Sequence, residues 1–435
     1  MIIIDRELER REAQGKPVRV ATTGAGFIAR GMTNRIANHT KGMELSVIVN
    51  RTPANAVRCF AEAGIDDPVE VETAAQLTAA IEAGRPAYTS DHRVATECEL
   101  IDCMVEGTGT IHYAIPVVLD SIAGGKHVIM LNAELDAVIG PLFKARADAA
   151  GVVYTGADGD QPGVQMNLLR FVEGIGARPL VAGNIKGLLD HYRTPETQAR
   201  FAAEWGATAE MVTSFADGTK IAFEQAVVAN ATGFTVAERG MIGPDFDGFI
   251  DDAVSFYDVD RMEELGGIVD YVVGTRPGPG VYVFAVHDDP QQRPYLKYGK
   301  LGDGPLYSFY VPYHLCHFEI PNSVARAVLF GDPTIEPTHG PMVDVITIAK
   351  TDLAAGTTLD GLGGFHTYGL CERHDVTRSD RLLPIGMAEG CTLANDVAKD
   401  QAITYDDVVV PDGRLLDRLR GEQDALFPLD AVAVH

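Results

Sequence analysis

The sequence predicts an α/β fold: a doubly wound parallel sheet, then an α+β domain, then a small, mostly-β domain. Three observations predict it. Short apolar runs alternate with helical patterns over the first 160 residues, a glycine-rich turn follows the first of these runs, and short strand-like segments with long loops dominate from about residue 179. Alternating strands and helices form parallel sheets, which bind ligands at the carboxyl ends of their strands. Functional residues are therefore expected where the predicted strands end.

The first predicted strand runs directly into the turn Gly24-Ala-Gly26-Phe27-Ile28-Ala29. The first glycine permits a sharp turn, the second lets the backbone approach a pyrophosphate closely, and the small alanine lets the next helix pack against the strand. Phosphates would lie at the helix N-terminus, where free N–H groups favour anions. The pattern predicts a Rossmann-type dinucleotide site at Gly24, Gly26, Phe27, Ile28 and Ala29. A glycine-rich corner without a ligand is the alternative.

The second predicted strand, Met43–Val49, ends at Asn50-Arg51-Thr52. These residues lie about 20 positions beyond the turn, where proteins of this type read the cofactor ribose. An NAD site would carry Asp or Glu here, whereas the guanidinium of Arg51 would pair with the 2′-phosphate of NADP(H). We therefore expect Asn50, Arg51 and Thr52 to select NADP(H). The alternative is that Arg51 is a solvated surface residue.

Further strands are predicted at residues 86–90, 100–105 and 127–131 and from residue 151 onward. Polar and small residues follow two of them: Glu106, Gly107, Thr108 and Asn132. Because ligands bind at the carboxyl ends of parallel strands, we expect these four residues to face the cofactor crevice.

The first domain is predicted to span residues 1–160, and residues 315–332 could complete it. Residues 161–314 are expected to form the substrate-binding domain, and residues 333–435 a third domain that Pro- and Gly-rich joints make separable. The elements predicted in these two domains are a helix at 166–175 and strands at 180–186, 211–215, 269–273, 280–285 and 343–349.

Composition limits the class of function. The chain has 435 residues, 46% of them hydrophobic, and a formal net charge of −25. A strongly acidic chain without a basic stripe repels nucleic acid, and no run reaches the 18 apolar residues of a membrane span. The charged stretch after Met1-Ile-Ile-Ile4 does not fit a signal peptide. We expect a cytoplasmic homo-oligomer that acts on a small-molecule substrate, without nucleic-acid or membrane partners.

Cysteine usage gives no metal motif. The six cysteines form no CxxC pair, and we expect them to be reduced core thiols. The segment His314-Leu-Cys316-His317 contains metal-ligating residue types. On a strand, however, His314 and Cys316 would share a face that His317 would not, and the spacing is not that of a zinc motif.

A stretch centred on Asn132-Ala133-Glu134, between His127-Val-Ile-Met-Leu131 and Gly140, resembles homoserine dehydrogenase. The chain is similar to a group of homoserine-dehydrogenase-like oxidoreductases with a C-terminal SAF domain, which includes the 1-deoxy-D-xylulose 5-phosphate reductoisomerase-like enzymes. The segments that carry the similarity are 156–162, 217–220, 224, 229–233, 299–305 and 312–315, with 383–386 and 403–406 in the SAF-like part. Ala133 stands where homoserine dehydrogenases have a functional lysine, so we expect a different substrate.

Lys186 and Lys220 are the leading catalytic candidates. Carbonyl reduction by NADPH requires a proton donor to the developing alkoxide, and oxidation requires a base. Each lysine is expected to close a strand or tight turn of the substrate domain. The alternative is that both are solvated, as most lysines are.

Carboxylates and cations near the predicted domain joint are further candidates. Glu134 and Asp160 are expected to serve catalysis, and together with Asp158 they could hold a divalent metal. The alternative is that the turn aspartates cap their own backbone. The residues expected to bind substrate are Asp190, His191, Lys300 and His314.

Together these features predict an NADP(H)-dependent oxidoreductase that transfers a hydride to or from a small polar, phosphorylated hydroxy or oxo compound. Two alternatives stay open. One is the reductoisomerase-like reaction of isoprenoid precursor synthesis, which the resemblance implies and which would require a divalent metal. The other is a non-catalytic redox sensor that binds NADP.

Overall fold

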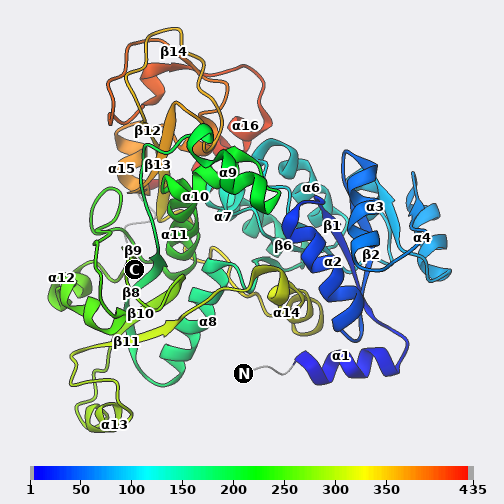
Figure 1. Ribbon diagram of the computed structural model, residues 1–435, viewed down its shortest axis with the longest axis horizontal. Coiled ribbons are helices and arrows are strands. Elements are labelled where there is room, and N and C mark those ends of the chain that lie inside the picture. Colours follow the sequence, from blue (N-terminus) through cyan, green and yellow to red (C-terminus); the bar gives the residue numbers. More distant parts are fainter. Residues whose placement is uncertain (1–3, 430–435) are drawn as a thin grey trace. The chain divides into compact units, whose positions relative to one another are not determined.

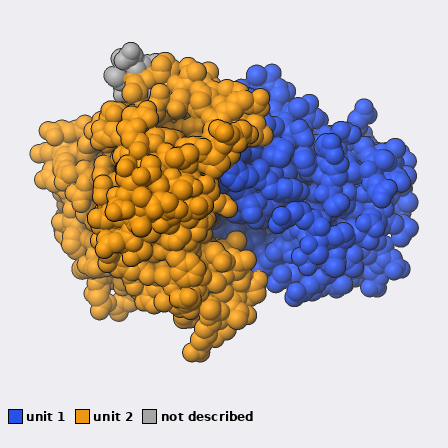
Figure 2. Space-filling model, turned by 90° about the horizontal axis from the view of Figure 1, so that it is seen from above, with its two compact units in different colours: residues 1–136, 142–160, 315–336 blue, residues 137–141, 161–314, 337–435 orange. Residues whose placement is uncertain are grey.

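The computed structural model describes residues 4–429, which form two compact units coloured separately in Figure 2. Unit 1 comprises residues 1–136, 142–160 and 315–336. Unit 2 comprises residues 137–141, 161–314 and 337–435, so the segment 337–435 belongs to the same unit as 161–314. The division into three domains therefore stays a prediction.

Unit 1 is built on the predicted parallel sheet, and the doubly wound architecture is confirmed. The strand order is β3-β4-β2-β1-β5-β6-β7, and every neighbouring pair is parallel. The order reverses between β1 and β5, which is where ligands bind in sheets of this type. The strands are β1 (Val18–Thr23), β2 (Met43–Val49), β3 (Val69–Glu70), β4 (Ala87–Thr89), β5 (Cys103–Glu106), β6 (His127–Met130) and β7 (Tyr154–Gly156).

Helices flank this sheet (Figure 1). They are α1 (Ile4–Ala13), α2 (Phe27–His39), α3 (Pro53–Glu62), α4 (Ala74–Glu82), α5 (His92–Thr96), α6 (Ile111–Ala123), α7 (Ala133–Ala150) and α14 (Cys316–Phe330). The late helix α14 packs against α2, and the two share a buried core that includes Met32, Ile36, Ile320 and Val324. The expectation that residues 314–317 form a strand is wrong, since Cys316 begins α14.

Unit 2 contains a four-stranded sheet in the order β11-β10-β8-β9. Its strands are β8 (Arg178–Lys186), β9 (Ile268–Val273), β10 (Gly280–Val286) and β11 (Leu306–Val311), which confirms three predicted strands. The strand predicted at 211–215 is wrong, because these residues lie in α10 (Ala209–Ala216). Thr208 caps that helix by accepting a hydrogen bond from the Met211 N–H, and Val212, Thr213 and Ala216 form its buried stripe.

The other helices of this part are α8 (Gln161–Gly174), α9 (Pro195–Trp205), α11 (Thr219–Thr232), η1 (Ile250–Phe256), α12 (Val259–Glu264) and α13 (Arg293–Tyr298). Twelve of the fourteen residues of α11 are buried. This helix packs against α8, α10 and β9 and against two strands near the C-terminus, β12 (Val343–Ala349) and β13 (Thr367–Arg373). The predicted strand at 343–349 is therefore confirmed and pairs antiparallel with β13.

The C-terminal part of unit 2 is completed by short elements. They are α15 (His374–Ser379), η2 (Ile385–Met387), β14 (Thr392–Leu393), η3 (Tyr405–Asp407), β15 (Val408–Val409) and α16 (Leu415–Leu426). Among residues 4–429, the structure contains no helix with the length and apolar character that a membrane crossing requires.

A buried ion cluster anchors α16. The Asp344 carboxylate, on β12, accepts hydrogen bonds from Arg420 Nη1 at 2.8 Å and from His374 Nδ1 at 2.7 Å. Arg420 also donates to the Val138 carbonyl oxygen at 2.9 Å. Burial alone would raise the pKa of Asp344, but Arg420 and His374 hold it well below its ordinary value. The cluster therefore stabilises the fold above the ordinary carboxyl pKa, and this stabilisation is lost as acidification protonates the native carboxylate.

We expect Asp344→Asn to lower the free energy of unfolding by about 3 to 5 kcal/mol, because the buried Arg420 guanidinium loses its buried carboxylate partner and keeps only Asp424, at 3.2 Å, as a counter-charge. Denaturant-induced unfolding at neutral pH measures this change. Asp375→Asn is the matched control, since it removes an exposed partner of Arg373 and should change stability by less than about 1 kcal/mol. Equal small losses in the two variants would contradict the anchoring role.

Candidate functional site

The predicted glycine turn lies at the reversal point of the unit 1 sheet. Gly24 has a φ of +90°, and a Cβ at this position would lie 2.8 Å from the Gly107 carbonyl oxygen. The Gly107 N–H donates to the Thr23 carbonyl, which ties the turn after β5 to the end of β1. Only a residue without a side chain fits this close approach in this backbone conformation.

The start of α2 is open for a ligand. Gly26 is its N-cap residue, makes no side-chain cap, and has no atom within 4 Å of an added Cβ. Phe27 is about half exposed (52%), whereas Ala29 is buried against the core, as the small-residue argument predicts. The first N–H groups of the helix can thus bind an anion such as a pyrophosphate.

Arg51 lies directly after β2 with its side chain exposed. Among residues 4–429 it forms no ion pair or side-chain hydrogen bond. Asn50 instead shapes the loop, because its Nδ2 donates to the Thr52 carbonyl oxygen at 2.9 Å. The Arg51 guanidinium is therefore available to a phosphate group.

Glu106 ends β5 and is fully buried. Its Oε1 accepts hydrogen bonds from the Thr108 N–H at 3.0 Å and the Thr108 hydroxyl at 2.5 Å, while its Oε2 has no partner. Burial raises the pKa of this carboxyl. Asn132 caps α7 and donates to the Thr110 carbonyl at 3.1 Å. These two side chains hold the loop after β5, and Glu106 retains one unused buried oxygen.

In unit 2, charged side chains meet where β8 ends. Lys186 is the last residue of β8, and its Nζ donates to the Phe215 carbonyl oxygen at 3.3 Å. Burial lowers the pKa of Lys186; Glu224 raises it, and the nearby Lys220 lowers it. Lys186 is partly buried and hydrogen-bonded, so it is not a fully solvated lysine. Lys220 lies in the first turn of α11, after the turn that follows α10, so it follows a tight turn and not a strand.

Unit 2 also contains buried amide atoms without partners. Asn184, two residues before Lys186, donates from Nδ2 to Glu224 Oε2 at 3.4 Å, but its own Oδ1 has no partner. Gln165 on α8 and Gln225 on α11 are fully buried, and neither of their amide groups is paired. The elements that contain these amides pack together in unit 2, since α8 contacts both β8 and α11. Native proteins rarely leave such groups unpaired without a ligand or water.

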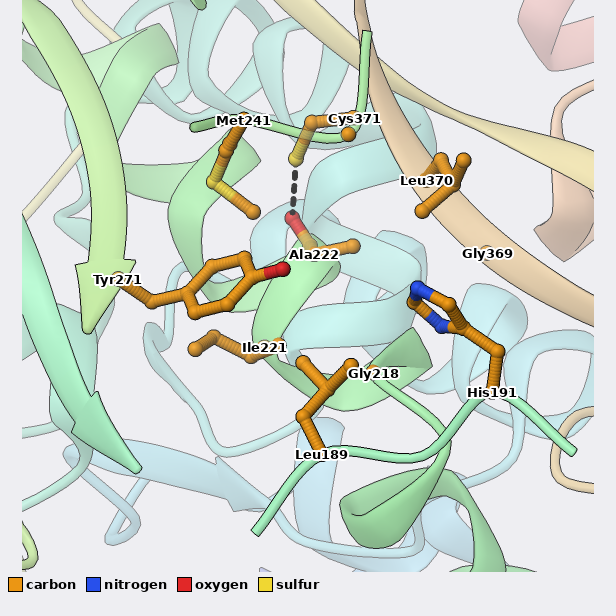
Figure 3. Close-up of a pocket in the computed structure, with 11 residues that line it drawn as sticks. Leu189, His191, Gly218, Ile221, Ala222, Met241, Tyr271, Gly369, Leu370 and Cys371 are labelled. Carbon is orange, nitrogen blue, oxygen red and sulfur yellow. Dashed lines mark hydrogen bonds between the residues drawn. The ribbon is translucent and has the colours of Figure 1, made fainter. Parts of the chain in front are cut away.

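The turn before α11 is held by residues that sequence reasoning missed. The Asp217 carboxylate forms a buried ion pair with Lys350 at 3.0 Å. A small pocket beside this turn is lined in part by His191, Gly218 and Cys371 (Figure 3). Lys220 and Glu224 are four residues apart, a spacing that places two side chains on the same face of a helix, so this spacing could have indicated Glu224 as a neighbour of Lys220. Nothing in the local sequence indicates Lys350.

The residues expected to bind substrate do not form one group. His191 Nδ1 lies 2.7 Å from the Asp217 carbonyl oxygen, so this side chain reaches the turn before α11. Asp190 pairs with Arg193 at 3.0 Å. His314 Nε2 lies 3.2 Å from Gln161 Nε2. Lys300 is exposed between α13 and β11, and no interaction among the described residues joins it to the lysine pair.

The three carboxylates proposed for a metal have different surroundings. Asp158 is buried and accepts hydrogen bonds from Thr334 at 3.1 Å and from Arg326 at 3.4 Å, all within unit 1. Glu134 lies in the first turn of α7, and Asp160 lies before α8. Across residues 4–429, no group of three or more His, Cys, Asp or Glu side chains is arranged to hold a metal ion. The structure therefore adds no support for a metal at these carboxylates.

Comparison with known families gives one match. Residues 159–320 match the family model "Oxidoreductase DRL, catalytic domain". The matched family is one of oxidoreductases. The segment contains Asn184, Lys186, Lys220 and Glu224, all residues of the charged cluster in unit 2. No curated protein sequence matches the chain.

Several solved structures are similar in part. They include an NAD-binding oxidoreductase from Klebsiella pneumoniae (18% identity, 40% of this chain, 43% of that chain, TM-score 0.28). A myo-inositol dehydrogenase from Lactobacillus casei has 16% identity over 42% of this chain and 50% of that chain, with a TM-score of 0.30. An Agrobacterium radiobacter oxidoreductase has 14% identity over 46% and 54%, with a TM-score of 0.29. The chain thus spans about half the length of these neighbours, and similarity at this level carries no functional argument.

We expect Gly24→Ala to abolish dinucleotide binding in a protein that still folds. The added methyl group would contact the Gly107 carbonyl oxygen and force the turn to open, at a cost of about 1 to 3 kcal/mol. Quenching of protein fluorescence by NADPH and NADH measures the binding. Gly64→Ala is the matched control, because Gly64 also has positive φ but no atom within 4 Å of its Cβ position. Unchanged affinity in Gly24→Ala would contradict the assignment of this turn.

Proposed function

We propose that the protein is an NADP(H)-dependent oxidoreductase that transfers a hydride to or from a small, polar, phosphorylated hydroxy or oxo compound. Unit 1 binds the dinucleotide at the glycine turn, and unit 2 holds the substrate at the charged cluster. The observation that carries the proposal is the desolvated Lys186 beside Lys220 and Glu224, within the segment that matches an oxidoreductase catalytic domain.

The cofactor assignment is supported by the exposed Arg51 after β2. Residues 50–52 contain no carboxylate, the group that would repel a 2′-phosphate at this position. A guanidinium that lacks an internal partner can form two parallel hydrogen bonds to a phosphate.

The substrate assignment is supported by the charges and amides of unit 2. Lys186 and Lys220 provide a positive pair in a chain with a net charge of −25, which suits a phosphate group on the substrate. The unpaired Oδ1 of Asn184 and the unpaired amide groups of Gln165 and Gln225 suit the hydroxyl groups of a small polar molecule.

The proposed reaction uses Lys186 as the proton donor. In the reducing direction, the Lys186 ammonium would transfer a proton to the carbonyl oxygen of the substrate, while a bound NADPH would supply the hydride for the carbonyl carbon; the products would be an alcohol, NADP⁺ and a neutral amine. Oxidation is the reverse. A lowered pKa makes this ammonium a better acid at neutral pH.

A substrate screen tests the function. Purified protein is incubated with NADPH and phosphorylated ketoses, including 1-deoxy-D-xylulose 5-phosphate, and with NADP⁺ and phosphorylated hydroxy acids or homoserine, while absorbance of the reduced nicotinamide is followed. Turnover of any of these substrates supports an oxidoreductase. NADPH binding without turnover of any compound would instead favour the redox sensor.

Arg51→Glu should reverse the cofactor preference, because a carboxylate accepts from the ribose hydroxyl but repels the 2′-phosphate. The loss of a charged hydrogen bond of about 1.5 to 3 kcal/mol predicts at least roughly tenfold weaker NADPH binding. Fluorescence titration with NADPH and NADH gives both affinities, and Arg85→Glu, on another exposed loop, serves as the control. Equal affinity of the wild-type protein for both cofactors would contradict the role of Arg51.

Lys186→Met should lower kcat by about 100-fold or more, since a positioned general acid is lost. Its melting temperature should stay the same or rise, because the charged form of a lysine with a lowered pKa is disfavoured in the folded state. For the wild-type protein, reduction should slow as the pH rises through the lowered pKa of Lys186, and this decline should be absent in the variant. Lys16→Met, at an exposed position of unit 1, is the control. Full turnover in Lys186→Met would show that another group supplies the proton.

A further inference from the structure

The ammonium group of Lys350 lies in a buried junction of unit 2. This residue directly follows β12 and is 5% exposed. Its Nζ donates to the Arg193 carbonyl at 2.8 Å, the Gly364 carbonyl at 2.9 Å and Asp217 Oδ2 at 3.0 Å. An ammonium has three donors, so Lys350 is fully satisfied by three segments that are far apart in the sequence.

One of these partners, Asp217, sets the turn from which α11 begins. Its Oδ1 accepts a hydrogen bond from the Thr219 N–H at 2.9 Å, and its Oδ2 binds Lys350. Between them, Gly218 has a φ of +91°, a conformation that favours glycine. Lys220 is the second residue of the helix, so the position of its side chain depends on this turn.

The hairpin of β12 and β13 also contacts α11 directly. The Gly369 N–H donates to the Thr219 hydroxyl at 3.0 Å, and Cys371 Sγ donates to the Ala222 carbonyl at 3.1 Å (Figure 3). A Cβ at Gly369 would lie 3.2 Å from the Thr219 side chain and 2.7 Å from Val345. The first turns of α11 are therefore held by the β12–β13 hairpin, and Lys350 directly follows β12 of this hairpin.

The charge of Asp217 also reaches the proposed proton donor. The Lys186 ammonium binds the Phe215 carbonyl, two residues before Asp217, and the charge of Asp217 raises the pKa of Lys186. The Asp217 carboxylate is itself bonded to Lys350. Without Lys350, it would be a buried anion without that ion-pair partner, next to the Lys186 site.

We propose that Lys350, which lies far from the other site residues in sequence, is a positioning residue for the Lys186 and Lys220 site and acts through Asp217. This inference rests on the proposed function. By binding Asp217, Lys350 fixes the turn before α11 and keeps a carboxylate from neutralising the two lysines that hold and protonate the substrate.

Trace labelling with acetic anhydride tests this inference without a substrate or cofactor. Only the neutral amine reacts, so the labelling of Lys186 across a range of pH, measured by peptide mass spectrometry, reports its protonation. In Lys350→Met, the unpaired Asp217 should raise the pKa of Lys186 and lower its labelling near neutral pH about tenfold. Lys126→Met is the matched control, because Lys126 is equally buried (6%) but lies in unit 1.

The double variant Asp217→Asn with Lys350→Met separates positioning from a merely structural role. Removal of the carboxylate should return Lys186 labelling to at least the wild-type level. An unchanged Lys186 profile in folded Lys350→Met, or the same loss of labelling in the single and double variants, would overturn the inference. If Lys350→Met does not fold, the single variant Asp217→Asn tests the inference. Increased Lys186 labelling near neutral pH then supports a link through Asp217, and an unchanged labelling profile overturns the inference.

The two proposals fail in different ways. Absence of cofactor-dependent turnover, together with the expected labelling shift, contradicts the oxidoreductase function alone. Turnover that Lys186→Met abolishes, together with an unchanged labelling profile in Lys350→Met, contradicts the role of Lys350 alone.

Discussion

Burial of the helix α11 is the constraint on which unit 2 depends. This helix packs against α8, β9 and the β12–β13 hairpin, and charged residues gather at its N-terminal turns and where β8 ends. Burying ammonium and carboxylate groups costs free energy unless each has a partner. The Asp217–Lys350 pair meets this requirement. Asn184 Oδ1 and the amide groups of Gln165 and Gln225 are buried without a partner. The contrast distinguishes groups that the fold itself satisfies from groups that a ligand can satisfy.

Unit 1 could be predicted from the sequence because its signals are local. The apolar runs of β1 and β2 and the turn at Gly24 and Gly26 each depend on a few neighbouring residues, and the structure has them where the pattern predicts. The error at 211–215 has a local cause as well. Its β-branched residues suggested a strand, but the cap at Thr208 and the helical spacing of the buried residues decided the conformation.

The site of unit 2 could be predicted only in part. Lys186 and Lys220 were identified as single residues, and Glu224 through a family resemblance, but their proximity depends on how β8 and α11 pack. In the sequence, Lys350 is a single lysine that follows a strand. Its burial follows from long-range contacts with Arg193 and Gly364. Desolvation, which lowers the pKa of Lys186, is likewise a property of the packed structure and has no signature in the sequence.

The route of the chain through the two units affects how the protein is made. The α2 face that contains Met32 and Ile36 is covered by α14, which the ribosome synthesises only after the whole four-stranded sheet of unit 2. At a translation rate of about 5 to 20 residues per second, this apolar face of α2 stays uncovered for roughly 15 to 55 s before α14 is synthesised. During translation unit 1 therefore has an incomplete core, which makes it a natural client for chaperones that bind exposed apolar helices.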